Sequence, residues 1–150
     1  MPKKVVVVWG GNNCGKTSTL NLLIEHLLGI KGSNVLTKEH CLIIKTKGKC
    51  KHDRVGIATR GDTEGNVREN CKFFDKCNLL SGDKDIVFLA VRSSKDPTTT
   101  PPCNKVATVI QKYADSHGAT IVPQQKTKAI PPVSFIMSNQ KMEKLLYKLI

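Results

Sequence analysis

Residues 10–17 read Gly-Gly-Asn-Asn-Cys-Gly-Lys-Thr and fit the pattern G-x-x-x-x-G-K-[S/T] at every specified position. The flanking sequence fits as well: an apolar run, Val5–Trp9, leads into the segment, and an amphipathic stretch, Lys16–Leu28, leaves it. A buried strand that enters a glycine-rich loop and continues as a helix is the setting in which this pattern binds phosphate. The segment therefore predicts a strand–loop–helix unit with an anion site at the start of the helix.

Each residue type in this loop has a chemical reason. Gly10 and Gly15 allow the backbone to curl so that its N–H groups point into one cavity, which the positive end of the following helix also faces. Lys16 is expected to reach the outer phosphates, and Thr17 to offer its hydroxyl to a magnesium ion. The residues expected to contact phosphate are Gly10, Gly11, Asn12, Asn13, Cys14, Gly15, Lys16, Thr17 and Ser18.

Two of these positions have a second interpretation. Ser18 either contacts an inner phosphate or is an ordinary residue of the first helical turn. Cys14 is either a thiol activated by the nearby helix N-terminus or a small residue that the loop tolerates.

On these residues the chain resembles the P-loop (Walker A) nucleoside triphosphatase superfamily over residues 5–28. The resemblance implies a bound nucleoside triphosphate, ATP or GTP, with Mg²⁺, and phosphoryl transfer as the chemistry. Asp62-Thr63-Glu64-Gly65 also matches the Asp-x-x-Gly element of GTPases, but Asn104-Lys105-Val106-Ala107 lacks the final aspartate of their guanine-reading element. We therefore rank ATP above GTP.

The rest of the chain alternates between strand and helix patterns, which predicts a three-layer α/β/α sandwich with a mainly parallel sheet. We expect one domain spanning residues 1–150. After the first strand, extended segments are expected at 34–36, 41–46, 55–59, 85–91, 119–122 and 133–137. The expected helices are 16–28, one that opens at a capping box of Asn66 and Glu69, 104–117 and 141–150.

Ligands in such sheets bind beyond the carboxyl ends of the strands, and this rule sorts the acidic residues. Asp62 follows the strand that ends at Thr59, so it is the best candidate to hold magnesium; otherwise it forms a turn beside Gly61. Asp85 begins its strand and is expected about 20 Å from that end. The strand that Asp85 opens ends in Arg92-Ser93-Ser94, without the acid that is usual in the superfamily.

Arginines collect at the same predicted end. Arg60 and Arg92 both follow strand ends, and Arg68 lies in the first turn of the next helix. Each either contacts phosphate, where Arg60 or Arg92 would stabilise charge on a transferring group, or forms a surface ion pair. Glu64 is the second candidate acid. It either orients an attacking water or deprotonates an acceptor hydroxyl, or it is an acid of the first helical turn.

The net charge of +12 favours anionic partners beyond a nucleotide, such as nucleic acid or a phosphorylated substrate. The densest basic segment, Lys45–Lys51, is expected to be extended, with alternate lysines on one face. It either binds a polyanion or protects an exposed sheet edge from aggregation.

The six cysteines are expected to be free thiols, because a phosphate loop implies the reducing cytosol. Apolar runs are too short to span a bilayer, so we expect a cytoplasmic protein without a membrane partner. The primary functional prediction is a small ATPase or ATP-dependent kinase. The alternative is a nucleotide-dependent switch or binding module, GTPase-like or associated with nucleic acid, with little catalysis of its own.

Overall fold

The computed structural model describes residues 2–30 and 38–150 of the chain. Within these ranges the order of elements along the chain is β1 (Lys4–Gly10), α1 (Lys16–Leu28), β2 (Cys41–Lys45), β3 (Arg54–Ala58), α2 (Glu64–Lys76), β4 (Asp85–Arg92), α3 (Lys105–His117), β5 (Thr120–Gln125) and α4 (Phe135–Tyr147).

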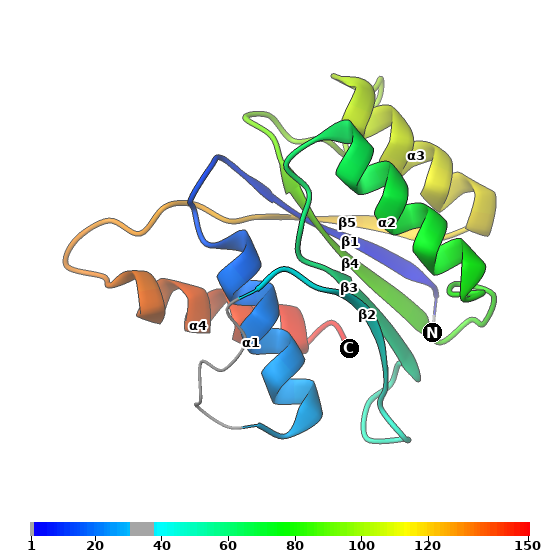
Figure 1. Cartoon of the computed structure of the whole chain (residues 1–150), viewed down its shortest axis with the longest axis horizontal. Helices are drawn as coiled ribbons and strands as arrows, with labels where there is room; N and C mark the ends of the chain where they lie inside the picture. Colours follow the sequence, from blue (N-terminus) through cyan, green and yellow to red (C-terminus); the bar gives the residue numbers. More distant parts are fainter. Residues whose placement is uncertain (1, 31–37) are drawn as a thin grey trace.

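The strands form one sheet in the order β2-β3-β4-β1-β5, in which every neighbouring pair is parallel except β2 with β3. Helices α1 and α4 cover one face of this sheet, and α2 and α3 cover the other (Figure 1). This arrangement confirms the predicted three-layer α/β/α sandwich with a mainly parallel sheet.

Two hydrophobic cores follow from the alternation of side chains along the central strands. In β1, Val5 and Val7 pack toward α2 and α3, whereas Val6 and Val8 pack toward α1 and α4. All four valines are fully buried, and so are most residues of β4. Burial on both faces is typical of parallel strands between two helical layers.

Local signals set most helix ends. Gly29 and Gly118 end α1 and α3 in the left-handed conformation, with φ of 75° and 63°. Asn104 caps α3 through a side-chain bond from the Ala107 N–H. The helices predicted at 16–28 and 104–117 are therefore confirmed to within one residue.

Three local predictions are wrong. Helix α2 opens earlier than expected, with a capping box of Thr63 and Asn66 rather than Asn66 and Glu69. Residues 133–137 are not a strand, because Ser134 accepts a bond from the Met137 N–H and starts α4 at Phe135. Helix α4 therefore begins six residues before the predicted position and ends at Tyr147.

The lysine-rich segment also differs from its prediction. Strand β2 ends at Lys45, and residues 46–53 form a turn in which Lys47 and Gly48 have positive φ. The lysines of this segment therefore do not alternate along an extended strand. The extended piece predicted at 34–36 lies outside the described residues.

The amino end of the sheet carries a buried ion pair. Asp85 lies at the amino end, as predicted, where it is buried and pairs with Arg54 at 2.6 Å.

All six cysteines are free. In the part of the chain that the structure describes, no helix combines the length and apolar character needed to traverse a bilayer.

Candidate functional site

The carboxyl ends of the strands meet where the glycine-rich loop leaves β1. In the sheet register Gly10 lies beside Arg92 of β4, and Trp9 lies beside Gln125 of β5. A cavity of about 260 Å³ opens at this end, beside the first turn of α1. Its lining residues are Asn12, Asn13, Cys14, Gly15, Lys16, Thr17, Ser18, Glu39, Thr59, Gly61, Asp62 and Phe135.

The loop backbone needs glycine at two points. Gly15 precedes α1 with φ of 104°, a conformation that side chains rarely adopt. A Cβ on Gly10 would lie 2.3 Å from the Lys126 carbonyl oxygen and 2.8 Å from Cys14 Sγ. Gly10 therefore allows the end of β5 to approach the loop closely. A Cβ atom added at Gly11 would have no neighbour within 4 Å.

Lys16 is folded against the loop that precedes it. Its ammonium donates to the carbonyl oxygens of Gly10 at 3.1 Å and Gly11 at 2.7 Å, and lies 3.7 Å from Cys14 Sγ. Lys16 is only 8% exposed, and Cys14 is buried beside it. The loop thus places a positive charge at the wall of the cavity and at the N-terminus of α1, where an anion is favoured.

The cavity lining includes oxygen ligands suited to magnesium. One is the Thr17 hydroxyl, which donates to the Thr59 carbonyl at 2.9 Å. Asp62 lines the same cavity and is exposed, so the structure places this predicted acid at the site. Glu39 also lines the cavity and was not predicted. A hydroxyl and two carboxylates are the hard donors that Mg²⁺ prefers, so the residues present fit this ion.

The position of Glu39 depends on tertiary contacts. The next residue, His40, donates its backbone N–H to the Thr59 hydroxyl at 2.7 Å, and its carbonyl accepts the Thr59 N–H at 2.9 Å. These bonds hold the chain entering β2 against the end of β3. No motif in the sequence marks Glu39, because the pairing that brings it to the cavity joins residues about twenty positions apart.

The three predicted arginines do not line the cavity. Arg60 reaches its edge only through Glu39, with Nε 3.2 Å from the Glu39 carboxylate. Arg68 pairs with Glu64, and both line a different groove, between α2 and α3. The Arg92 side chain is exposed, while its backbone N–H donates to the Gly61 carbonyl at 2.9 Å.

Lys126, just after β5, is a second cation that sequence reasoning missed. Its ammonium donates at 2.9 Å to the carbonyls of Cys14 and Thr127 and to the Ser138 hydroxyl. Lys126 is 3% exposed, and its removal from water lowers its pKa, against an opposing effect of Cys14. This buried ammonium holds the glycine-rich loop from the side opposite the cavity and adds positive potential to the site.

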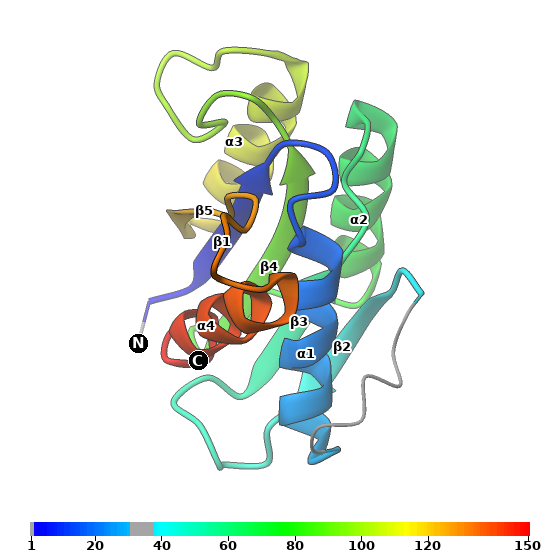
Figure 2. The same cartoon turned by 90° about the vertical axis from the view of Figure 1, so that its left-hand side faces the viewer.

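The first turn of α4 closes the same side of the loop. Asn139 is buried and accepts a bond from the Thr19 hydroxyl at 3.4 Å, and a Cβ on Gly15 would lie 2.3 Å from its side-chain oxygen. Phe135 lines the cavity and is 44% exposed. Figure 2 shows the connection from β5 to α4 passing beside the start of α1.

Comparisons with known proteins leave the family open. No family model matches the chain. A search of curated proteins also found no match. Among solved structures, the chain is similar to a mutant of the APS kinase CysC of Mycobacterium tuberculosis, with 15% identity, a TM-score of 0.45, and coverage of 97% of this chain and 99% of that chain. The interpretation of the site therefore rests on its own geometry.

Proposed function

We propose that the chain binds ATP with magnesium and transfers its terminal phosphoryl group, as a small ATPase or an ATP-dependent kinase. The observation that carries this proposal is the cavity at the start of α1, which combines the end of the glycine-rich loop and the first turn of α1 (residues 12–18), the Lys16 ammonium and two carboxylates. A polyphosphate needs inward N–H groups, a cation and oxygen ligands for its metal, and this cavity supplies all three kinds of group.

The residues have separable roles in this proposal. The backbone N–H groups of residues 12–17 hold the phosphates, and Lys16 exchanges its carbonyl partners for outer phosphate oxygens. Thr17 and Asp62 hold the magnesium, which when bound neutralises charge on the phosphate oxygens. Glu39 either completes the ligands of the metal or orients the acceptor, while Arg60 holds its carboxylate in place.

Phosphoryl transfer from ATP forms a bond between an acceptor oxygen and the γ-phosphorus. The bond from that phosphorus to the bridging oxygen breaks, and its electron pair leaves with ADP. The acceptor, water or a substrate hydroxyl, loses its proton to a carboxylate of the cavity, for which Glu39 and Asp62 are the two candidates. Arg60, just after β3, and Arg92, the last residue of β4, are candidates for charge stabilisation once a nucleotide is bound.

A second candidate function is a nucleotide-dependent switch, and the end of β4 favours it. This buried strand ends in Arg92-Ser93-Ser94 and provides no carboxylate to the cavity. Asp62 connects the site to α2 through its neighbour, the N-cap residue Thr63. Occupancy of the site would then change the position of α2 rather than lead to rapid turnover.

Nucleotide turnover distinguishes the two functions. We expect Mg-ATP hydrolysis to be measurable in the wild type and to fall about 100-fold or more in Asp62→Asn. Glu39→Gln provides the parallel test of the unpredicted acid, and Asp83→Asn is a control for an exposed carboxylate outside the cavity. Tight Mg-ATP binding without turnover in the wild type would contradict the enzyme and favour the switch.

Binding itself is measured through Trp9, the single tryptophan, which lies next to Gly10. We expect Mg-ATP to change the Trp9 fluorescence in the wild type and in the control Lys112→Ala, but not in Lys16→Ala. Loss of charge-assisted bonds worth about 1.5–3 kcal/mol each weakens binding about 10- to 100-fold. Calorimetric titration that detects no heat with ATP or GTP and magnesium would refute nucleotide binding altogether.

A further inference from the structure

We propose that a lysine surface at the amino end of the sheet binds the phosphate backbone of a nucleic acid duplex. The surface consists of six exposed lysines, called here the amino-end lysines: Lys45, Lys47, Lys49, Lys51, Lys84 and Lys148. They lie at the opposite end of the sheet from the phosphate loop (Figure 2). The proposal is therefore independent of nucleotide binding.

Backbone hydrogen bonds bring these lysines together from three parts of the chain. The Asp53 N–H donates to the Lys84 carbonyl at 2.8 Å, which joins the β2–β3 turn to the loop before β4. The His52 N–H donates to the Ile150 carbonyl at 3.0 Å, which joins the same turn to the segment after α4. Lys148 follows α4 directly, so its charge adds to those of the turn.

The turn that carries the densest lysines is held in one conformation. His52 is fully buried, and its Nδ1 lies 3.0 Å from the Ile150 carbonyl oxygen. The Thr46 hydroxyl donates to the His52 carbonyl at 2.7 Å, and the Thr46 N–H donates to the Asp53 carbonyl at 2.9 Å. A fixed backbone presents Lys47, Lys49 and Lys51 with a smaller entropy loss on binding than a flexible tail would.

The charge of this surface is not neutralised locally. Among the residues that the structure describes, none of the amino-end lysines forms an ion pair. Two exposed aspartates, Asp53 and Asp83, are nearby, whereas Asp85 is buried in its pair with Arg54. Six lysines against two exposed carboxylates leave a positive field that attracts a polyanion.

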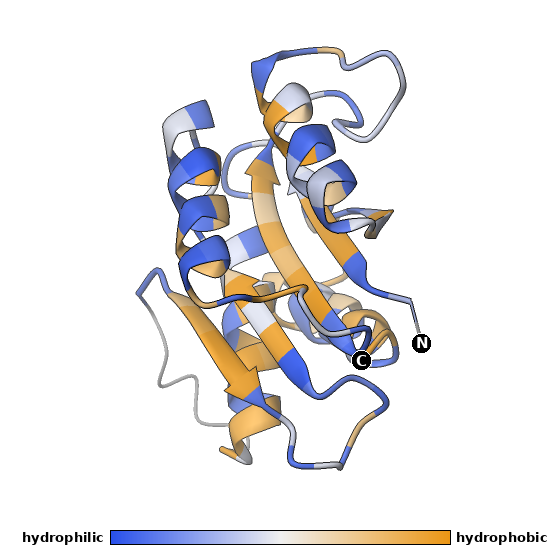
Figure 3. Cartoon of the chain, turned by 90° about the vertical axis from the view of Figure 1, so that its right-hand side faces the viewer, coloured by the Kyte–Doolittle hydropathy of each residue, from blue (hydrophilic) through white to orange (hydrophobic). Residues whose placement is uncertain are grey.

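The chemistry of the surface favours a duplex backbone over other anionic partners. None of the described residues 38–72 is an exposed large hydrophobic residue, so the β2–β3 turn has no such side chain to insert into a membrane. Figure 3 shows this turn mainly in hydrophilic colours. It carries no Phe, Tyr or Trp on which unpaired bases would stack, and its His52 is fully buried. A surface made of lysines without stacking residues is suited to contact phosphates, and the charge density of phosphates is highest along a duplex.

Salt-dependent binding of a fluorescent DNA duplex of about 20 base pairs and random sequence tests the proposal. Fluorescence anisotropy is measured between about 50 and 200 mM salt with the wild type and the triple variant Lys47→Gln, Lys49→Gln, Lys51→Gln. The matched control removes the same charge elsewhere, with Lys72→Gln, Lys105→Gln and Lys112→Gln in the groove between α2 and α3. All six positions are exposed, and circular dichroism verifies that both variants keep the fold.

We expect the turn variant to bind about 10- to 100-fold more weakly at about 100 mM salt, with the salt slope reduced by about 3. The control is expected to change affinity about twofold at most. Equal weakening in both variants would show that net charge alone drives binding and would overturn the proposal. So would unchanged binding in the turn variant, tighter binding to a single strand, or equal binding to anionic lipid vesicles in the same buffer. A protein that binds DNA in this way without binding ATP would refute only the proposed function.

Discussion

At the scale of single residues, the conformation of the glycine-rich loop depends on how closely neighbouring segments approach its backbone. Gly10 and Gly11 are adjacent in sequence and identical in type, yet only Gly10 is packed against another segment. Lys126 and Lys128 likewise differ in burial: Lys126 is bonded to the loop, whereas Lys128 is exposed. These two pairs separate the effect of position from the effect of residue type.

Gly10→Ala is expected to destabilise the protein by about 1–3 kcal/mol, because its Cβ would force the Lys126 carbonyl and the Cys14 thiol to move. Gly11→Ala is expected to change the free energy of unfolding by less than about 0.5 kcal/mol. Urea unfolding of both variants measures the difference. Similar destabilisation of the two would show that the approach of β5 to the loop is not tight.

Lys126→Met is expected to weaken Mg-ATP binding about tenfold, since it removes a positive charge and releases the Cys14 carbonyl from its donor. Lys128→Met removes the same charge from an exposed position two residues later and is expected to have little effect. Calorimetric titration of Mg-ATP into both variants measures the change. Equal losses would indicate that Lys126 acts only through the overall charge of the protein.

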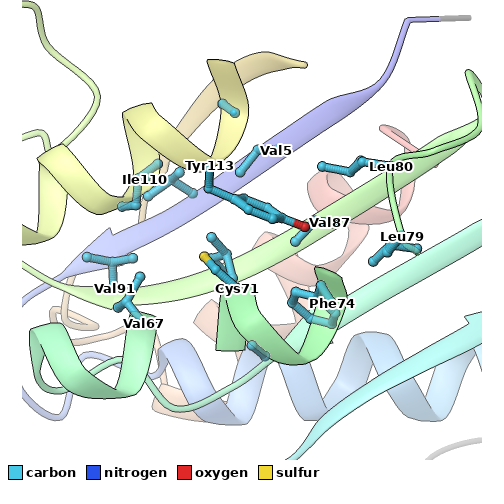
Figure 4. Packing of buried hydrophobic residues seen from close by; sticks show 14 residues of the cluster. Val5, Val67, Cys71, Phe74, Leu79, Leu80, Val87, Val91, Ile110 and Tyr113 are labelled. Carbon is cyan, nitrogen blue, oxygen red and sulfur yellow. The ribbon is translucent and has the colours of Figure 1, made fainter. Parts of the chain in front are cut away.

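At the scale of elements, α2 and α3 enclose a core with two thiols near a tyrosine. Figure 4 shows Cys71 of α2 and Tyr113 of α3 pointing toward each other between these helices, with Val5 and Val87 close to the tyrosine ring. The phenol oxygen of Tyr113 has no hydrogen-bond partner in the described chain, and its removal from water raises the pKa of the phenol. Burial likewise raises the pKa of Cys71 to about 12 and of Cys41 to about 11.

These raised pKa values predict a loss of stability at alkaline pH. The unfolded thiols ionise near their ordinary value of 9.0, whereas the folded thiols stay protonated to about 11 and 12. The folded state then binds more protons, so the free energy of unfolding falls as the pH rises above 9. Urea unfolding between about pH 8 and 11 measures the slope.

The double variant Cys41→Ala, Cys71→Ala is the control for this slope. The difference between wild type and variant removes the contribution of lysines, including Lys126, whose lowered pKa acts in the opposite direction below 10.5. We expect the variant to have the smaller alkaline slope, whatever its stability at neutral pH. Identical slopes would show that the thiols ionise alike in both states.

At the scale of the whole molecule, the cavity beside α1 joins several parts of the fold. Residues 12–18 link a central strand to α1, Asp62 and Thr59 follow β3, Glu39 precedes β2, and Phe135 opens α4. A ligand that contacts all of these segments binds only the folded chain. Its binding energy therefore adds to the stability of the whole sheet with its helices.

Mg-ATP at about 100 times its dissociation constant is expected to raise the free energy of unfolding by about 2.7 kcal/mol. The same nucleotide concentration is expected to leave the stability of Lys16→Ala almost unchanged. Urea unfolding with and without Mg-ATP measures both values. An equal increase in the Lys16→Ala variant would place the nucleotide somewhere other than the loop.

The sequence by itself determined the strand–loop–helix unit of residues 5–28, the ends of α3 and the mainly parallel sheet. These depend on short-range periodicity, on glycine after a helix, and on capping residues, all of which are local. The start of α4 was predicted wrongly, because Val133, Phe135 and Ile136 are β-forming residues, whereas the Ser134 cap starts a helix there.

Only the tertiary structure decided which side chains surround the loop. Glu39 and Phe135 line the cavity, and Lys126 donates to the Cys14 carbonyl behind it, because β2 pairs with β3, β5 pairs with β1 and α4 packs against α1. The predicted Arg92 does not line the cavity. Such contacts join residues far apart in the chain. Their geometry follows from the order of strands and the packing of two helical layers, which local patterns do not encode.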